Sequence, residues 1–150
     1  MKTLRAFLVL VLSVLAFSWA PPSEATHTVG VTLRLSYGRS DANRRVCSNL
    51  NVSSGSDHIV DGLEVLQAAT DAHCISGYIT SGDDTSGHFV ESIDGLSGAP
   101  AAALRIVYWE MRVNGACSEV GVDDYAASPG DVLWFAYNSW ATWDTPAGCP

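Results

Sequence analysis

A stretch of strict alternation, Thr28–Tyr37, constrains the fold of this chain more than any other part of it. Its odd-numbered positions carry large apolar side chains, and its even-numbered positions carry threonine, glycine, arginine or serine. A period of two is typical of a β-strand that turns one face to a hydrophobic core and the other to solvent or a partner. The pattern therefore predicts a sheet with one buried face.

The segments that follow this strand predict a hairpin and then a helix. Turn residues at 38–43 lead into a returning strand over Arg44–Val52. Polar residues 53–57 break the chain and offer N-cap side chains. Apolar residues at spacings of three and four then predict one amphipathic helix over His58–His73.

Beyond residue 74 the pattern returns to strands. Short runs at Gly77–Thr80 and His88–Ile93 are separated by a polar loop, and alternation resumes over Leu104–Val113. A strong turn signal follows at 114–115, and a last strand is expected over Val132–Asn138. One helix among five to seven strands predicts an α+β domain in which a mostly antiparallel sheet packs on one helix.

The amino terminus has the order of a secretory signal peptide. A basic segment at residues 1–5 precedes the apolar run Ala6–Ala20, and small residues at positions 23 and 25 suit cleavage after Ala25. Cleavage after Ala20 is the alternative, but it would place a proline first in the mature chain. The apolar run is shorter than the roughly 20 residues that a spanning helix needs. We therefore expect residues 1–25 to be removed and residues 26–150 to be exported as one domain, with no membrane span in the mature chain.

Four cysteines remain in the exported part of the chain: Cys47, Cys74, Cys117 and Cys149. An even number in a short exported chain predicts two disulfides, because the compartment is oxidising. The sequence leaves all three pairings open. The spacing includes no Cys-x-x-Cys pair, which disfavours a zinc site.

The charge of the chain argues against nucleic acid as a partner. The full chain has 16 acidic and 8 basic residues, and removal of residues 1–25 leaves 15 acidic residues, six arginines and a formal charge of −9. Such a chain offers DNA or RNA no overall basic surface. The same charge disfavours an anionic ligand.

The sequence shows no catalytic constellation. It contains neither a Gly-x-Ser-x-Gly nor a Ser-x-x-Lys motif. Aspartate pairs at 83–84 and 123–124 lie in predicted loops, where adjacent carboxylates point apart and are usually solvated, unlike the converging pair of a glycosidase. The four histidines lack the paired spacing of metal ligands. We expect a protein that is not an enzyme and that has neither a metal site nor a cofactor.

Aromatic side chains favour a binding role instead. By alternation, Tyr108 and Trp109 face opposite sides of their strand, and Trp134 and Phe135 do the same. A one-sided sheet can bury only one residue of each pair. We therefore expect at least one exposed aromatic ring, which could stack on a flat ligand or hold a partner.

Four sequence blocks together resemble a known family. They are residues 87–96 (GHFVESIDGL), 108–115 (YWEMRVNG), 121–125 (GVDDY) and 130–134 (GDVLW). Their order and spacing resemble the C-terminal domain of transcobalamin and gastric intrinsic factor, and the wider family of secreted domains named after it. The resemblance extends from about Val29 to Tyr137 and implies a β-grasp-like α+β fold for residues 26–150.

The resemblance also implies a ligand site, because in the cobalamin carriers this domain lies over one face of the corrin ring. The family's Ser-Gly-Pro-Tyr stretch matches Ser86-Gly87-His88-Phe89, and its Phe-Trp pair matches Tyr108-Trp109. A glycine lets the backbone approach a planar ring, and a neighbouring aromatic side chain removes apolar edge from water. His88 stands where the family has proline, and we expect it to lie exposed rather than to coordinate cobalt.

We therefore expect a secreted, extracellular binding domain for cobalamin, another corrinoid or a comparable flat small molecule. The expected ligand-binding residues are Ser86, Gly87, His88, Phe89, Tyr108, Trp109 and Glu110. The carriers close their site with a large helical barrel, for which the 125 residues left after cleavage have no room. Binding should then be weak unless a partner supplies the other half. The alternative is an extracellular protein-interaction module that uses an aromatic sheet face.

Overall fold

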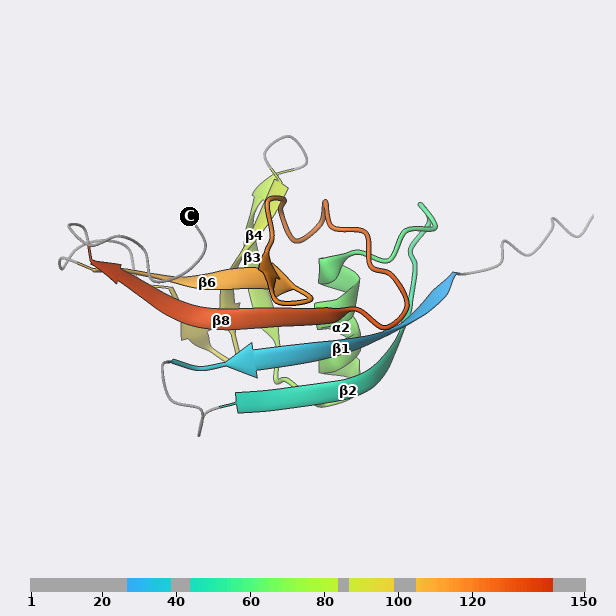
Figure 1. Ribbon diagram of the computed structural model, residues 1–150, viewed down its shortest axis with the longest axis horizontal. Coiled ribbons are helices and arrows are strands. Elements are labelled where there is room, and N and C mark those ends of the chain that lie inside the picture. The colour runs from blue at the N-terminus through green and yellow to red at the C-terminus, as the bar shows by residue number, and fades with distance from the viewer. Residues whose placement is uncertain (1–26, 39–43, 84–86, 99–104, 142–150) are drawn as a thin grey trace, which may run out of the picture.

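The computed structural model describes residues 27–38, 44–83, 87–98 and 105–141 (Figure 1). The predicted leader, residues 1–25, lies outside these ranges, and its removal stays a prediction. Among the described residues, no helix is long and apolar enough to cross a membrane. The described elements are, in chain order, β1 (Thr28–Ser36), β2 (Arg44–Ser53), α2 (Gly62–Asp71), β3 (Tyr78–Asp83), β4 (Gly87–Ile93), β5 (Leu96–Ser97), β6 (Arg105–Val113), β7 (Ala116–Cys117) and β8 (Val132–Ala141).

Two sheets and one helix make up the described part of the fold. The larger sheet has the strand order β2-β1-β8-β6-β7, and the smaller one has the order β3-β4-β5. Only the β1–β8 pair is parallel among the described strand pairs. In Figure 1 the helix α2 lies behind β1 and β8, and it contacts β1 and β2. For the described residues, the predicted mostly antiparallel sheet with one helix is confirmed, and the separate smaller sheet is an addition to it.

The alternation of β1 produces the core as predicted. Its four inward residues, Val29, Val31, Leu33 and Leu35, are at most 1% exposed. They pack with buried residues of the other strands and of α2 in one hydrophobic cluster. Burying such aliphatic side chains contributes about 1.5–3 kcal/mol each. This shared core holds the strands of the larger sheet against the helix.

The helix is shorter than the predicted range of 58–73 because its cap lies later in the chain. Asp61, rather than a residue of 53–57, is the N-cap, and it forms a capping box with Glu64. The Asp61 carboxylate accepts the Glu64 N–H at 2.8 Å, and the Glu64 carboxylate accepts the Asp61 N–H at 3.1 Å. His58 has a φ of 63°, which excludes it from a right-handed helix.

The end of β3 also differs from the prediction. β3 extends through Asp83, since residues 81–83 pair with residues 87–89 of β4. The predicted polar loop is shorter for that reason. The turn at Asn114-Gly115 is confirmed, with φ values of 52° and 88°. It joins β6 to the two-residue strand β7.

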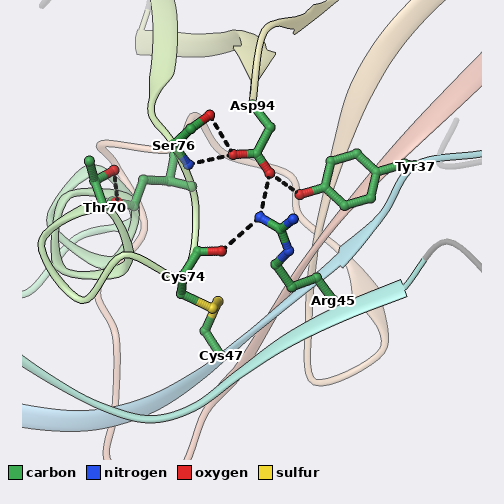
Figure 2. Close-up of a disulfide and its surroundings, with 8 residues drawn as sticks. Tyr37, Arg45, Cys47, Thr70, Cys74, Ser76 and Asp94 are labelled. Carbon is green, nitrogen blue, oxygen red and sulfur yellow. Dashed lines mark hydrogen bonds and ion pairs between the residues drawn. A yellow bond between two sulfur atoms is a disulfide. The ribbon is translucent and has the colours of Figure 1, made fainter.

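One disulfide joins Cys47 on β2 to Cys74, just beyond the end of α2 (Figure 2). Their Cα atoms are 6.0 Å apart. Cys117 is also disulfide-bonded, and Cys149 lies outside the described residues. No cysteine in the described ranges is free. The prediction of disulfide stabilisation is confirmed for these three cysteines.

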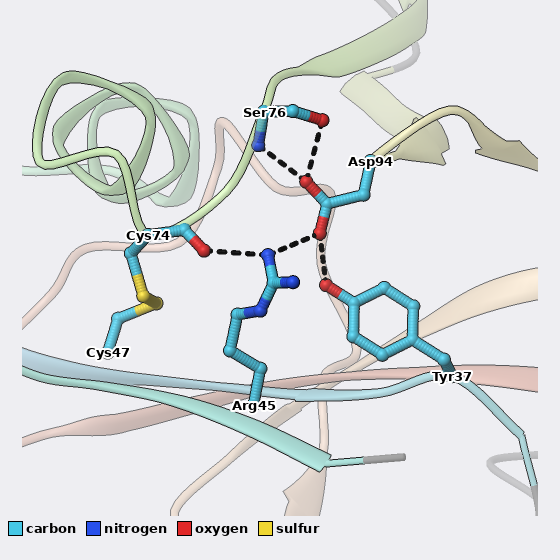
Figure 3. A network of polar contacts seen from close by, with 6 residues as sticks. All are labelled: Tyr37, Arg45, Cys47, Cys74, Ser76 and Asp94. Carbon is cyan, nitrogen blue, oxygen red and sulfur yellow. Dashed lines mark hydrogen bonds and ion pairs between the residues drawn. A yellow bond between two sulfur atoms is a disulfide. The ribbon is translucent and has the colours of Figure 1, made fainter.

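A carboxylate beside this disulfide ties the two sheets together (Figure 3). Asp94, in the turn after β4, accepts the Tyr37 hydroxyl and the Arg45 guanidinium, the latter at 2.8 Å, on one oxygen. Its other oxygen accepts the Ser76 N–H at 2.5 Å and the Ser76 hydroxyl at 2.9 Å. Arg45 also donates to the Cys74 carbonyl at 2.8 Å. The network therefore joins β2 and the residue that follows β1 to the one end of the smaller sheet at which β3 begins and β4 ends.

The protonation of this network follows from its donors. Burial acts to raise the pKa of Asp94, but hydrogen bonds from Tyr37 and Ser76, with the charge of Arg45, hold that pKa below its usual value. Burial raises the pKa of Tyr37, and its hydrogen bond to Asp94 raises it further. Tyr37 therefore stays a donor and Asp94 an acceptor at neutral pH.

Candidate functional site

A hollow of about 280 Å³ opens between β4, β6 and the loop that follows β7. Its lining comes from residues 88–90, 108–111, 118, 120–122 and 135. It thus brings together five of the seven predicted site residues, which are His88, Phe89, Tyr108, Trp109 and Glu110. Gly87 is buried and does not line the hollow. Ser86 lies outside the described residues.

The hollow borders an edge of β6 that β7 leaves uncovered. Within the described ranges, β7 pairs only with Arg112 and Val113. Further along the same edge, the Met111 carbonyl accepts the Ser118 N–H at 3.0 Å. Because the N–H and C=O groups of a strand alternate from one edge to the other, those of Trp109 point to the same edge as those of Met111. Trp109 therefore presents backbone polar groups to the hollow.

The Trp109 ring itself belongs to the core. The residue is 7% exposed, and its indole N–H donates to the Leu96 carbonyl at 2.9 Å. The ring packs edge-on against Tyr37 at 5.8 Å between centroids and tilts against Tyr137 at 5.2 Å. Such aromatic pairs favour T-shaped or tilted contact. Any contact of Trp109 with a ligand would come from its backbone.

Tyr108 and Glu110 lie on the opposite face of β6 from the Trp109 ring, as alternation predicts. Glu110 is 4% exposed, and its carboxylate accepts the side-chain amide of Asn138 at 2.7 Å and the Arg112 guanidinium. Burial, and then the charge of Glu110, raises the pKa of the half-buried Tyr108. The hydrogen bonds of the Glu110 carboxylate thus connect residues of β6 and β8.

Phe89 is the predicted site residue most accessible to a ligand. It is 60% exposed, and Val120 on the loop side of the same hollow is 49% exposed. Both are large apolar residues that lose water contact when something covers them. Phe89 thus supplies the exposed aromatic ring at the hollow, whereas Tyr108 and Trp134, the outward members of the two alternating pairs, are half-buried.

His88 is paired rather than fully exposed, which corrects the expectation for this residue. The Asp123 carboxylate accepts the His88 N–H at 2.7 Å and lies 2.6 Å from the imidazole Nδ1. The Val122 N–H donates to the His88 carbonyl at 3.1 Å. These three contacts hold the loop against β4. Asp123, expected to be solvated, thus anchors the loop that lines the hollow, and its place in the block at 121–125 was its only sequence signal.

The charge state of Asp123 depends on that histidine. Burial acts to raise the pKa of Asp123, but the hydrogen bonds from the His88 side chain and backbone hold it below its usual value. The carboxylate therefore remains ionised at neutral pH.

Gly87 has a local role that the sequence did not reveal. Its φ of 77° lies in the left-handed region that favours glycine. A Cβ there would lie 3.1 Å from a carboxylate oxygen of Asp124 and 3.6 Å from one of Asp123. The absence of a side chain at Gly87 leaves room for the loop that carries Asp123 and Asp124. It does not enlarge the hollow, because Gly87 does not line it.

Loss of the Asp123 contacts should loosen the loop. We expect Asp123→Asn to lower the free energy of unfolding at neutral pH by about 1–2 kcal/mol, because charge-assisted hydrogen bonds from His88 are lost. Since the folded pKa of Asp123 is depressed, this contribution is complete above the usual aspartate pKa and is lost as the pH falls through the folded pKa. Urea unfolding at neutral and acidic pH measures both effects.

Asp124→Asn is the matched control for that experiment. Asp124 is the exposed neighbour in the same loop, and its substitution should change stability by less than about 0.5 kcal/mol. Equal losses for the two variants would show that the His88 contacts add no stability.

The described part of the chain contains no cluster of metal-ligating side chains. Within those ranges no group of three or more histidine, cysteine, aspartate or glutamate residues is placed to hold a metal ion. The His88–Asp123 pair supplies two such side chains.

Comparison with known proteins places the chain in a family. Residues 62–139, just over half of the chain, match the family model described as "Domain of unknown function (DUF4430)". The chain belongs to the DUF4430 family. The match includes α2, the smaller sheet, the residues that line the hollow and most of β8. No curated protein sequence matches this DUF4430 chain.

Two solved structures share the fold of the DUF4430 chain. Haptocorrin, solved in complex with Cbi, is 20% identical with a TM-score of 0.59, and the match covers 83% of this chain and 28% of haptocorrin. A protein of Ruminococcus gnavus ATCC 29149, for which the structure's authors suggest metal binding, is 13% identical with a TM-score of 0.50; the match covers 75% of this chain and 98% of that protein. These likenesses support a distant transcobalamin-like fold. The chain spans little more than a quarter of the length of haptocorrin.

Proposed function

We propose that this DUF4430 protein is a secreted, non-enzymatic binding protein that takes a corrinoid such as cobalamin, or a comparable flat small molecule, in the hollow between β4 and β6. One observation carries the proposal: five residues predicted to contact such a ligand border the same hollow. The fold likeness to haptocorrin, which was solved with Cbi bound, supports the choice of ligand class.

The hollow offers complementary contacts to such a molecule. The exposed Phe89 ring can cover an apolar edge, and the open β6 edge at Trp109 supplies backbone groups for polar substituents. The pair His88–Asp123 fixes the wall between them. A hollow of about 280 Å³ covers only part of a corrin-sized ligand. We therefore expect a Kd between about 1 µM and 1 mM.

Equilibrium dialysis of the purified chain against cobalamin tests the proposal. Saturable uptake of one ligand per chain within that range is the expected result. The absence of saturable uptake up to about 1 mM cobalamin would exclude the corrinoid.

A variant at the rim locates the site. Phe89→Ala should weaken cobalamin binding about fivefold to tenfold, because the ligand no longer buries an aromatic ring. Its free energy of unfolding should change by less than about 0.5 kcal/mol, since the residue is exposed. Ile79→Ala is the matched control, because Ile79 is 58% exposed on β3 and does not line the hollow. Equal weakening by both variants would place the site elsewhere.

A protein partner is the second candidate for the same surface. It is favoured by the two large apolar residues, Phe89 and Val120, that stay exposed at one hollow. A stoichiometric protein that co-purifies with the chain and is lost on Phe89→Ala, together with no cobalamin uptake, would select this alternative.

A further inference from the structure

The outer face of the larger sheet carries a second distinctive arrangement, centred on Trp134. This face is turned away from Phe135 and the core. In the register of the sheet, Arg34 on β1 and Arg112 on β6 are the direct neighbours of Trp134 on β8. Two arginines therefore flank the indole, one from each adjacent strand.

Two arginines contact the Trp134 ring, and one of them, Arg44, reaches it from further away. The guanidinium carbon of Arg44 lies 5.7 Å from the Trp134 ring centroid, and that of Arg112 lies 5.5 Å from it. Arg44 is on β2, two strands from β8, and strands are about 4.8 Å apart. Its side chain must therefore cross β1, where its partner in the register is the small and buried Ser36. Cation–π contact with the indole orients both guanidinium groups.

These residues form a basic patch on an acidic protein. We call Arg34, Arg44, Val46, Arg112 and Trp134 the arginine face. Among the described strand residues on this side of the sheet, Glu110 is the single carboxylate, and it is bonded to Arg112. The chain as a whole carries a formal charge of −8. Counted over the described strand residues of this face, the local charge is thus opposite in sign to the net charge.

The arginine face also contains a shallow cavity. About 80 Å³ of space lies among Arg34, Arg44, Val46 and Trp134, together with residues 35 and 45. That is roughly the volume of two to three water molecules, which suits a carboxylate group. Arg34 is exposed, and Val46 is 52% exposed and offers apolar surface to the carbon atoms that would carry such a group.

We propose that the arginine face docks an acidic, extended segment of a partner polypeptide, with one aspartate or glutamate side chain in the cavity beside Arg34. Guanidinium groups bind carboxylates through paired N–H donors, and the fixed Trp134 ring holds two of them in place. The remaining negative charge of the domain repels an acidic chain elsewhere, so this face sets the orientation of docking. Several weak contacts along an extended segment are needed, because the cavity holds a single carboxylate.

Fluorescence anisotropy of labelled hexaglutamate with the full purified chain tests this proposal, with labelled hexaglutamine as the neutral probe. We expect hexaglutamate to bind, hexaglutamine not to bind, and the affinity to fall at least fivefold between about 50 mM and about 300 mM salt. Arg34→Gln should weaken hexaglutamate binding about threefold to fivefold.

Two controls separate this face from other effects. Gln67→Glu on α2 changes the net charge by the same amount away from the arginine face, and it should alter binding by less than about twofold. Phe89→Ala should leave hexaglutamate binding unchanged, so the result is independent of corrinoid binding. No binding of hexaglutamate at about 1 mM, equal binding of hexaglutamine, or an equal effect of Arg34→Gln and Gln67→Glu would overturn the proposal. Competition by succinate at the affinity of the peptide would overturn the polypeptide as occupant.

Discussion

Removal of the Cys47–Cys74 disulfide, as the double variant Cys47→Ala/Cys74→Ala, is expected to lower the free energy of unfolding by about 3–4 kcal/mol. The bond closes a loop with a sequence separation of 27 residues, and without it the unfolded chain gains the conformational freedom of that loop. The bond also holds the end of α2 against β2 in the folded state (Figure 2).

Urea unfolding in the absence of reductant measures this loss, because the disulfide at Cys117 then stays intact in both proteins. The fitted denaturant slope should rise together with the loss, since the unlinked unfolded chain exposes more surface. A loss below about 1 kcal/mol would contradict this prediction and would mean that the disulfide restricts the unfolded chain far less than its loop length implies.

Replacement of the carboxylate at the centre of the neighbouring network is expected to have the next largest effect. Asp94→Asn should lower the free energy of unfolding at neutral pH by about 2–3 kcal/mol, because the amide turns one acceptor oxygen into a donor that faces other donors. Arg45 is 47% exposed in its side chain, so its ion pair contributes little. Most of the loss should therefore come from the contacts with Tyr37 and Ser76 (Figure 3).

The effect of Asp94 should depend on pH in a defined direction. Because the folded pKa of Asp94 lies below its usual value, its stabilising contribution is complete above the ordinary aspartate pKa, about 3.9. The contribution is lost as the pH falls through the lower folded pKa. The difference between wild type and Asp94→Asn should then shrink in acid. Glu119→Gln, at an exposed position, is the charge-matched control and should change stability by less than about 0.5 kcal/mol. A pH-independent difference would assign the loss to packing.

The faces of the strands were predictable because they depend on residues adjacent in the chain. Alternation in β1 identified its buried residues, and alternation in β8 put Trp134 and Phe135 on opposite faces, of which the structure buries Phe135. The residue at which α2 begins was harder to predict from the sequence. Several polar residues before the helix could serve as its cap, and packing decides among them. Gly62, for example, lies where a Cβ would come within 2.5 Å of the Val122 carbonyl oxygen.

The candidate site was predictable as a set of segments, but less so in its chemistry. The resemblance placed the expected ligand contacts on two of the segments that border the hollow, those around His88 and Tyr108. The ring of Trp109 nevertheless lies in the core. Because the side chains and the backbone polar groups of a strand point in different directions, only the backbone of Trp109 is presented to the hollow. The role of Asp123 was missed because its partner, His88, is 35 residues away in the chain.

The net charge of the chain did not predict the local charge of its surface. It disfavoured an anionic ligand for the whole chain, since acidic residues outnumber basic ones. The arginine face nevertheless brings the guanidiniums of Arg44 and Arg112 to one ring, with Arg34 beside that ring's residue in the register of the sheet. Composition averages over the surface, whereas binding depends on the local potential.

The sequence by itself determined the strand faces, the turn at Asn114-Gly115 and the mixture of one helix with several strands, because each of these depends on near neighbours in the chain. Only the tertiary structure decided which carboxylates are bound and where arginines gather. Asp94 meets Tyr37 across 57 residues, and Arg44 meets Trp134 across an intervening strand. Such partners are chosen by the pairing of strands and the packing of sheets, and no local pattern encodes that choice.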